Sequence, residues 1–449
     1  MEVMQRCPYY PYTCTMETIG SSSVRRWLIK SPSVVQVLYT CLVAFTAYCC
    51  MYAMRKPFTA ASYAGLEWHG IQFKIVLVVS QVLGYAISKF IGIRIISSMK
   101  QAHRSVWMIG LLLLALLSLL GFALTPFPYN ALWLFVNGLP LGMIWGVIFG
   151  YIEGRRTTEV LAAALSVNFI LSSGFVKSVG QWVLTEKGVP EFWMPFVVGM
   201  IFLPLLLLSI GLLEQIPPAS DADKAQRHVR TPMTAVDRRA LWRRYAPGFA
   251  LLMGVYLLLT IIRDVRDNFA VEIWTELGFG GRTAILTTAE IPVAVLTLLG
   301  LAALIAVKNN FKAFWLNHGL TLGGGATLAG STFLFQQHWI DPFTWMVLSG
   351  FALFVPYIIF NGILFDRLLA AFREPGNVGF LMYVADAIGY LGSVLVLLWR
   401  NFGFSKMSWI EFYCALCYVG SSLIIAMMVF SWVFFQSKSR VDRTGLATI

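Results

Sequence analysis

Apolar residues form twelve long runs along the chain, separated by short polar segments. Each run holds about 20 mainly apolar residues, the length that crosses roughly 30 Å of hydrocarbon. The runs lack the strict alternation of apolar and polar positions that is typical of a membrane β-barrel. Because backbone groups in lipid must bond within their own segment, the runs predict transmembrane helices. They lie at residues 34–54, 71–93, 106–124, 131–152, 160–182, 193–213, 246–264, 283–306, 314–334, 343–365, 378–399 and 410–434.

The longest polar stretch, residues 214–244, divides these runs into two sets of six. It contains Pro217, Pro218 and many charges, so it is typical of a linker. We therefore predict an all-α membrane protein of 12 transmembrane helices, built as two pseudo-symmetric six-helix bundles. The predicted parts are an N-terminal segment (1–33), a first bundle (34–213), a linker (214–245), a second bundle (246–434) and a C-terminal tail (435–449).

Composition and charge agree with a membrane location. Hydrophobic residues make up 58% of the chain and charged residues 12%, whereas a soluble domain carries about 25% charged residues. About 23 of the 34 Lys and Arg residues fall on the side of the termini and the linker, so the positive-inside rule places that side in the cytoplasm. The sequence thus predicts a multi-pass protein of the cell (inner) membrane with both termini cytoplasmic. Basic loops beside anionic lipid account for the net charge of +12 without nucleic acid.

A single offset of 208 residues relates the ends of the first and seventh runs. It matches Tyr48, Tyr52 and Arg55 with Tyr256, Thr260 and Arg263. Each set follows the helical spacing i, i+4, i+7, so each places three polar side chains on one helix face. The repeat favours a duplicated fold with one arginine contributed by each half.

Further charges lie inside the predicted spans. Each costs about 2.5–3.5 kcal/mol on insertion scales, so we expect it to face a cavity or a partner. Several share a helix face with other polar residues, which favours a water-filled path for a polar solute. These stripes are Gln81, Tyr85 and Lys89; Ser173, Lys177 and Gln181; Thr283, Thr287 and Glu290; and Tyr383, Asp386 and Tyr390.

Structural roles compete with this interpretation. Lys56, Arg266 and Asp267 would be solvated if they lay at the outer interface, and Asp264 or Asp267 would neutralise Arg263 or Arg266. Lys177 and Asp386 would form an ion pair between the halves. Arg55, Lys89 and Arg263 are harder to explain structurally, because three cations share few nearby acids. A ridge of small residues predicts close helix packing; it consists of Gly138, Gly142, Gly146, Gly150 and Gly154.

Four segments resemble the organophosphate:phosphate antiporters of the major facilitator superfamily. Tyr52-Ala-Met-Arg55-Lys56-Pro57-Phe58 resembles the end of their helix 1, and Tyr85-Ala-Ile-Ser88-Lys89-Phe90 resembles their helix 2. Ala131-Leu-Trp133 through Asn137-Gly138, with Gly142 and Trp145, is similar to their helix 4, and Val255-Tyr256 through Arg263 to their helix 7. The resemblance implies the major facilitator fold and exchange of glycerol phosphate or sugar phosphates, with inorganic phosphate as counter-substrate. It also implies that Arg55 and Arg263 bind the phosphate, with Lys89 on the same basic path. Helix 5 departs from the family pattern, since Ser172 or Ser173 stands where a histidine is expected.

The sequence therefore predicts a monomeric secondary transporter, and not an enzyme, that moves a small anionic, organophosphate-like metabolite by alternating access. No GxxxxGK[ST] motif for ATP is present, and we expect no cofactor and no metal. The alternatives are a proton-coupled transporter of another polar solute and a transporter-like sensor that binds without transport. Glu290 and Asp386 are candidates for proton coupling, because burial favours a protonated carboxyl unless a cation lies near. The substrate-binding candidates are Arg55, Arg263, Lys89, Tyr52, Tyr85, Lys177 and Ser172.

Overall fold

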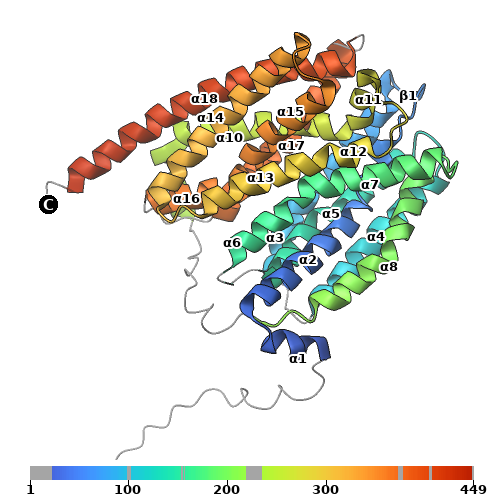
Figure 1. Ribbon diagram of the computed structural model, residues 1–449, viewed down its shortest axis with the longest axis horizontal. Helices are drawn as coiled ribbons and strands as arrows, with labels where there is room; N and C mark the ends of the chain where they lie inside the picture. The colour runs from blue at the N-terminus through green and yellow to red at the C-terminus, as the bar shows by residue number, and fades with distance from the viewer. Residues whose placement is uncertain are drawn as a thin grey trace, which may run out of the picture.

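The computed structural model describes residues 23–98, 103–152, 155, 157–218, 235–372, 378–403 and 407–446, and these are almost entirely helical. Two sets of helices lie side by side (Figure 1). A short helix, α1 (Ser23–Lys30), precedes the first set. The first set comprises α2 (Ser33–Tyr52), α3 (Phe73–Ser98), α4 (Arg104–Leu124), α5 (Ala131–Ile152), α6 (Thr158–Ser166), α7 (Asn168–Thr185) and α8 (Met194–Leu213), with a 3₁₀ turn at Pro57–Ala60.

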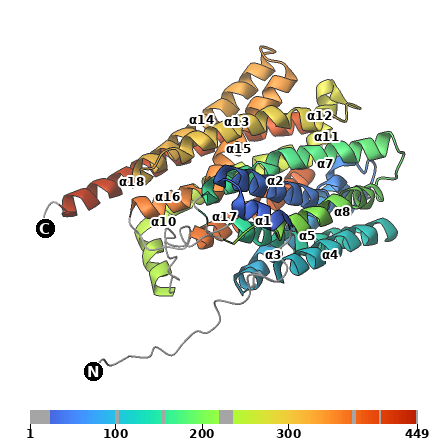
Figure 2. The ribbon, with the colours of Figure 1, turned by 60° about the horizontal axis from the view of Figure 1, so that its bottom comes forward.

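The second set begins with α10, a helix of 34 residues. A second view shows its helices stacked beside those of the first set (Figure 2). It comprises α10 (Ala235–Asn268), α11 (Ala270–Trp274), a π-helical turn (Thr275–Phe279), α12 (Ile285–Thr288), α13 (Glu290–Ile305), α14 (Asn310–Gln336), α15 (Pro342–Gly362), α16 (Leu364–Ala371), α17 (Val378–Gly403) and α18 (Trp409–Leu446).

The predicted all-α layout is confirmed. Within the described residues, ten helical segments are long and apolar enough to cross a membrane. Helices α14 and α17, which are 27 and 26 residues long, occupy the places of the predicted spans at 314–334 and 378–399. The fifth and eighth spans are each built from two helices, α6 with α7 and α12 with α13.

Two helices extend beyond their predicted bounds. Helix α10 starts at Ala235, inside the segment predicted as linker, and α18 continues to Leu446 in the predicted tail. Alanine and arginine are good helix formers, and they make up most of residues 235–244. The rest of the predicted linker, at 219–234, lies outside the described residues.

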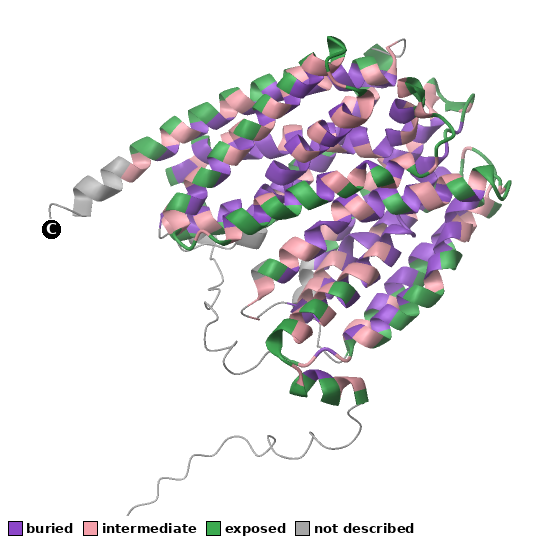
Figure 3. Ribbon diagram, in the orientation of Figure 1, coloured by how far each residue is buried: buried purple, intermediate pink, exposed green. Residues whose placement is uncertain are grey.

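Large apolar side chains cover the outward faces of the helices. Figure 3 shows exposed residues along the outer faces of α8, α13 and α18 and buried residues between the helices. A water-soluble protein rarely leaves contiguous apolar surface of this extent uncovered, whereas hydrocarbon covers it without cost. The chain is thus a multi-pass membrane protein, with exposed residues that include Leu42, Leu117, Leu208, Leu299 and Phe430.

The predicted glycine ridge brings α5 against α3. A Cβ atom at Gly138 would lie 2.4 Å from the carbonyl oxygen of Gln81, and one at Gly142 would lie 2.7 Å from the Cβ of Ser88. Only glycine permits so close a backbone approach. Close packing is therefore confirmed at these two positions, and it fixes the α3 face that carries Gln81, Tyr85 and Lys89. Gly154 lies outside the described residues.

The two halves meet along two seams. Helix α3 contacts α17, and α7 contacts α12 and α13. In the second seam Thr287 Oγ1 donates to Ser178 Oγ at 2.7 Å. Gly174 belongs to the same seam, where a Cβ atom would lie 2.3 Å from the carbonyl oxygen of Leu286. The halves are thus in van der Waals contact along these helices. A site between the two seams would be lined by residues of both halves.

A small hairpin of the first half also reaches the second half. Strands β1 (Glu67–Trp68) and β2 (Ile71–Gln72) pair antiparallel around His69 and Gly70. Both turn residues have positive φ, 50° and 74°, as a type I′ turn requires. Asn401 of α17 donates from Nδ2 to the Gly70 carbonyl at 2.8 Å and accepts from the Gln72 amide at 3.1 Å. The hairpin is therefore held to α17 by two hydrogen bonds.

Candidate functional site

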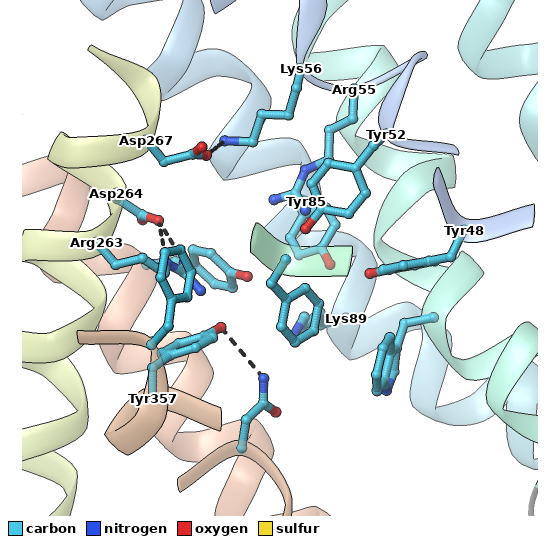
Figure 4. Close-up of a pocket in the computed structure, with 15 residues that line it drawn as sticks. Tyr48, Tyr52, Arg55, Lys56, Tyr85, Lys89, Arg263, Asp264, Asp267 and Tyr357 are labelled. Atoms are coloured by element: carbon cyan, nitrogen blue, oxygen red, sulfur yellow. Dashed lines mark hydrogen bonds and ion pairs between the residues drawn. The ribbon is translucent and has the colours of Figure 1, made fainter. Parts of the chain in front are cut away.

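A cavity of about 560 Å³ lies between the two halves (Figure 4). Both halves contribute to its wall, and most of the lining side chains are cationic, acidic or aromatic. The lining residues are Tyr48, Tyr52, Arg55, Lys56, Tyr85, Lys89, Trp145, Phe169, Arg263, Asp264, Asp267, Phe354, Tyr357, Asn361 and Tyr390. Five of the seven predicted substrate-binding residues are among them. The structure thus brings Tyr52, Arg55, Tyr85, Lys89 and Arg263 to one cavity.

Arg55 enters the cavity from the turn after α2. The helix cannot continue through Pro57, which has no N–H to donate, and Arg55 N bonds to the Tyr52 carbonyl at 3.0 Å. Gln81 Nε2 holds the Arg55 carbonyl at 2.8 Å. The guanidinium carbon lies 3.9 Å from the ring centroid of Tyr85 and 5.8 Å from that of Tyr52.

The charge of Arg55 has no counter-ion in the part of the chain that the structure describes. The residue is 9% exposed, and its Nε atom is buried without a hydrogen-bond partner. No carboxylate among the described residues forms an ion pair or a hydrogen bond with its guanidinium. A buried cation without a partner is costly, so this charge favours a cavity that receives an anion.

Arg263 reaches the cavity from α10, in the other half. Its Nη2 and Nε donate to Asp264 Oδ1 at 2.5 and 3.2 Å. Its guanidinium carbon lies 4.0 Å from the ring centroid of Tyr357. The Oδ2 atom of Asp264 is buried without a partner. Each arginine thus lies over a tyrosine ring, but only Arg263 bonds to a carboxylate among the described residues.

Lys89 forms an ion pair with Asp386 across the α3–α17 seam. Asp386 also accepts a hydrogen bond from the hydroxyl of Tyr256. The Nζ atom of Lys89 lies 5.5 Å from the ring centroid of Tyr85 and 5.4 Å from that of Tyr390. Lys89 therefore approaches the same tyrosine ring as Arg55, and a cavity solute can reach both cations.

The sequence-based pairing of Lys177 with Asp386 is wrong. Lys177 lies on α7, which packs on α12 and α13, whereas Asp386 lies on α17, which packs on α3. Lys177 instead bonds to Asp267 Oδ1 at 2.7 Å. The solvated position considered for Lys56 and Asp267 is also wrong, since Lys56 is 7% exposed and bonds to Asp267 Oδ2 at 2.5 Å.

The ion pairs of Asp267 lie at the end of the bundle where α2 and α10 finish, here called the bridged end. A second ion pair between the halves occurs there, from Lys74 Nζ to Glu272 Oε1 at 2.5 Å. Lys74 Nζ also donates to the Thr59 carbonyl at 2.8 Å. Sequence reasoning missed this pair, although a lysine near the start of a predicted span was a usable signal. The lysines come from the first half and the acids from the second.

Four predicted site residues do not line the cavity: Ser172, Lys177, Glu290 and Asp386. Ser172 Oγ donates to Asn168 Oδ1 at 2.5 Å within α7. Glu290 accepts from Arg266 Nη1 at 2.7 Å, and Arg266 also donates to the Met346 carbonyl at 3.1 Å. Both contacts satisfy polar groups inside the bundle. The structure thus gives Glu290 and Asp386 a cation each, Arg266 and Lys89.

Sequence reasoning missed several aromatic side chains of the wall. Trp145 and Phe169 of the first half lie with ring centroids 5.2 Å apart, and Phe169 meets Tyr357 of the second half at 6.1 Å. Phe354, Tyr357 and Asn361 follow the spacing i, i+3, i+7 on α15. That spacing places them on one helix face and was the available signal.

The charges around the cavity do not balance. Arg266 with Glu290 and Lys74 with Glu272 are neutral pairs. The charged residues of the cavity wall, together with the described residues that form ion pairs with them, comprise five cations and three carboxylates. Two positive charges are therefore in excess. The cations are Arg55, Lys56, Lys89, Lys177 and Arg263, and the carboxylates are Asp264, Asp267 and Asp386.

Residues 57–438 match the model of a protein family described as a family of unknown function, DUF5690. The match covers well over half of the chain. This chain belongs to the DUF5690 family. The matched region spans both halves of the fold and includes Lys89, Arg263 and Asp386, whereas Arg55 lies two residues before the start of the match. No curated protein matches the chain.

Solved transporter structures share the fold of this DUF5690 member. A D-xylose-proton symporter is 15% identical with a TM-score of 0.61, covering 91% of this chain and 97% of the other. A mutant of the nucleoside transporter NupG is 12% identical with a TM-score of 0.57, covering 89% and 100%. The xylose transporter XylE from E. coli, in a partially occluded inward open conformation, is 13% identical with a TM-score of 0.55, covering 89% and 98%. The all-α fold is therefore that of the major facilitator superfamily.

Proposed function

We propose that this protein is a secondary transporter that moves a small anionic, organophosphate-like metabolite across the membrane by alternating access. The observation that carries the proposal is Arg55, a buried guanidinium that faces a cavity between the halves without a carboxylate partner among the described residues. An anion in the cavity would relieve the cost of that unpaired charge. Guanidinium groups also bind phosphate and carboxylate oxygens in pairs.

The lining of the cavity suits an organic anion. Trp145, Phe169 and Tyr357 offer apolar surface for the carbon part of a solute. The two excess positive charges favour a doubly charged head group, such as a phosphate monoester, over a neutral solute.

The distribution of the site supports alternating access. Arg55 belongs to the first half and Arg263 to the second, so a bound anion contacts both. The bridged end is held by ion pairs between the halves, Lys56 and Lys177 with Asp267 and Lys74 with Glu272. In transporters built from repeats, rocking of the halves about a central site exposes that site to each side in turn. Breaking these ion pairs would open the bridged end.

The resemblance to organophosphate:phosphate antiporters supports the same substrate class, because Arg55, Lys89 and Arg263 all face the cavity. Inorganic phosphate is the proposed counter-substrate. We propose that the protein acts as a monomer, since each chain holds a complete cavity. Solved structures of such low identity show only that the fold is shared. Xylose and nucleosides, the solutes named for those transporters, are therefore not proposed as solutes of this protein.

The test is transport by the full-length protein in liposomes. Vesicles loaded with inorganic phosphate receive labelled glycerol phosphate outside, and uptake is followed with and without internal phosphate. The proposal predicts uptake that depends on internal phosphate and is not competed by neutral glycerol. Binding of glycerol phosphate without uptake would identify a sensor. Absence of both binding and uptake for phosphorylated and carboxylated metabolites would contradict the anionic substrate.

One observation favours proton coupling as the second candidate. Asp386 accepts from both Lys89 and Tyr256 beside the cavity. If the solute draws Lys89 away, Asp386 loses its cation and can take up a proton. Uptake driven by a pH gradient in vesicles without internal phosphate, and lost in Asp386→Asn, would favour this candidate over exchange. Glu290 and its partner Arg266 both lie outside the cavity wall, whereas Lys89, the partner of Asp386, lines it, so Glu290 is the weaker candidate for a proton carrier.

A further inference from the structure

Asp267 is a carboxylate of the second half that lies in a nest of donors from the first half. Lys177 Nζ bonds to its Oδ1 at 2.7 Å, and Lys56 Nζ bonds to its Oδ2 at 2.5 Å. Ser173 Oγ donates to Oδ1 at 2.5 Å, and Lys177 Nζ also contacts the Asp267 carbonyl at 2.8 Å. Each donor to this side chain belongs to α7 or to the turn after α2. We call Lys56, Ser173 and Lys177 the anion cradle.

The anion cradle is a built site. Ser173 and Lys177 are 2% and 3% exposed, and Lys56 is 7% exposed. Ser173 and Lys177 are one helical turn apart on α7, so their side chains lie on one face. Lys56 lies between the end of α2 and the 3₁₀ turn that starts at Pro57. Gln181 Nε2 donates to the Ala60 carbonyl of that turn at 2.5 Å. The backbone that carries the donors thus belongs to the first half, and Lys56 Nζ also donates to Asn268 Oδ1 of α10 at 2.8 Å.

We propose that the anion cradle is a binding site for the anionic solute when the bridged end is open, and that Asp267 occupies the same site as a tethered competitor when it is closed. The proposal rests on the proposed function for the movement of the halves. Separation of the halves at the bridged end withdraws Asp267, because it belongs to α10. Two buried lysines and a hydroxyl would then face water without an acid, and a phosphate or carboxylate group supplies the missing charge.

The cradle is continuous with the cavity. Lys56 and Asp267 both line the cavity wall, and Arg55 is the chain neighbour of Lys56 (Figure 4). Two lysines share a single carboxylate in the closed arrangement, so one positive charge remains in excess even there. An anion released from the cradle by the return of Asp267 thus passes to Arg55, the next cation. Solute and Asp267 exclude one another from the cradle, which couples closure of the bridged end to movement of the anion inward.

The test uses the full-length protein and inorganic phosphate as the probe, with binding measured by calorimetry at low ionic strength. Asp267→Asn empties the cradle of its tethered acid, and we expect it to bind phosphate at least about tenfold more tightly than the unmodified protein. The gain should disappear in Asp267→Asn with Lys177→Gln. It should persist in Asp267→Asn with Arg55→Lys, which separates the cradle from the cavity site of the proposed function.

Glu272→Gln is the matched control, because it removes an acid of the same half at the same end and leaves Lys74 unpaired. The proposal predicts no gain that depends on Lys177 in this control. Equal gains in Asp267→Asn and Glu272→Gln, or a gain that survives Lys177→Gln, would overturn the cradle. If Asp267→Asn does not fold, Lys177→Gln is measured in transport from the bridged side. A raised KM with unchanged kcat supports the cradle, and an unchanged KM overturns it.

Discussion

The guanidinium of Arg55 lies over the ring of Tyr85, with 3.9 Å between its central carbon and the ring centroid. Lys89, one turn further along α3, lies 5.5 Å from the same centroid. Two cations thus approach one aromatic ring, whose π electrons attract cations within about 6 Å of the centroid.

Replacing that ring should weaken solute binding without removing a charge. A cation–π contact contributes about 0.5–2 kcal/mol, and 1.4 kcal/mol corresponds to tenfold in affinity. Tyr85→Leu should therefore raise the Kd for the solute by roughly two- to thirtyfold, whereas Tyr85→Phe should change it little. The Kd is measured on detergent-purified protein. Equal Kd values for the leucine and phenylalanine variants would show that the ring does not position Arg55.

The pair of Lys89 and Asp386 should behave as a coupled unit in stability. Removing one partner of a buried ion pair costs about 3–5 kcal/mol, because the other charge is left uncompensated. Lys89 is partly exposed to the cavity, so we expect Lys89→Gln to fall at the low end of that range. The double variant with Asp386→Asn should recover most of the thermal unfolding midpoint. If the double variant lost as much in unfolding midpoint as the two single variants together, the pair would not be coupled.

Gly174 should be required for contact between the halves. A methyl group there would meet the Leu286 carbonyl and the Glu290 side chain, so Gly174→Ala should force α7 and α12 apart. We expect a lower unfolding midpoint and slower transport. Gly110 on α4 is the matched control, because a Cβ there meets nothing within 4 Å, and alanine in a helix gains about 0.5–1 kcal/mol over glycine. Equal effects of the two substitutions would contradict the close seam.

The orientation remains a prediction from loop charge. Single cysteines in a cysteine-free background test it, with an impermeant reagent applied to intact cells. Lys187→Cys, in the exposed loop after α7 at the bridged end, should be labelled from outside. His228→Cys, in the predicted linker, should be labelled only after the cells are opened. The reverse pattern would place the bridged end and the anion cradle in the cytoplasm.

Much of the fold was predictable because apolar periodicity decides helices in lipid. The positions of the twelve runs agree with the long helices, and the offset of 208 residues joined Arg55 and Arg263, which do face one cavity. The helix-face stripes also brought Tyr85 and Lys89 to the site. Each of these features is a property of a single helix, or of two helices related by the internal repeat.

The partners of the charges were not predictable in the same way. Opposite charge alone favours a pair of Lys177 with Asp386, whereas the packing of α7 on α12 and of α17 on α3 pairs Lys177 with Asp267 and Asp386 with Lys89. Glu290 had the spacing of a cavity residue but turns toward Arg266. Which helices face each other across the halves is a property of the assembled fold, and a single sequence does not contain it locally.

The central claim is that Arg55 binds the anion of the solute. Lysine keeps the charge but not the planar fork that pairs with phosphate oxygens. Each charge-assisted contact contributes about 1.5–3 kcal/mol, so losing that much weakens binding by roughly ten- to a hundredfold.

The measurement is the Kd of the folded Arg55→Lys protein for the anionic solute found by the transport screen, compared with Arg282→Lys. Arg282 is exposed, lies beside the ring of Phe279 and is absent from the cavity wall. The account predicts a Kd raised at least about tenfold in Arg55→Lys, a similar rise in Arg263→Lys, and no change in Arg282→Lys. An unchanged Kd in folded Arg55→Lys would contradict the anion site and, with it, the anionic substrate.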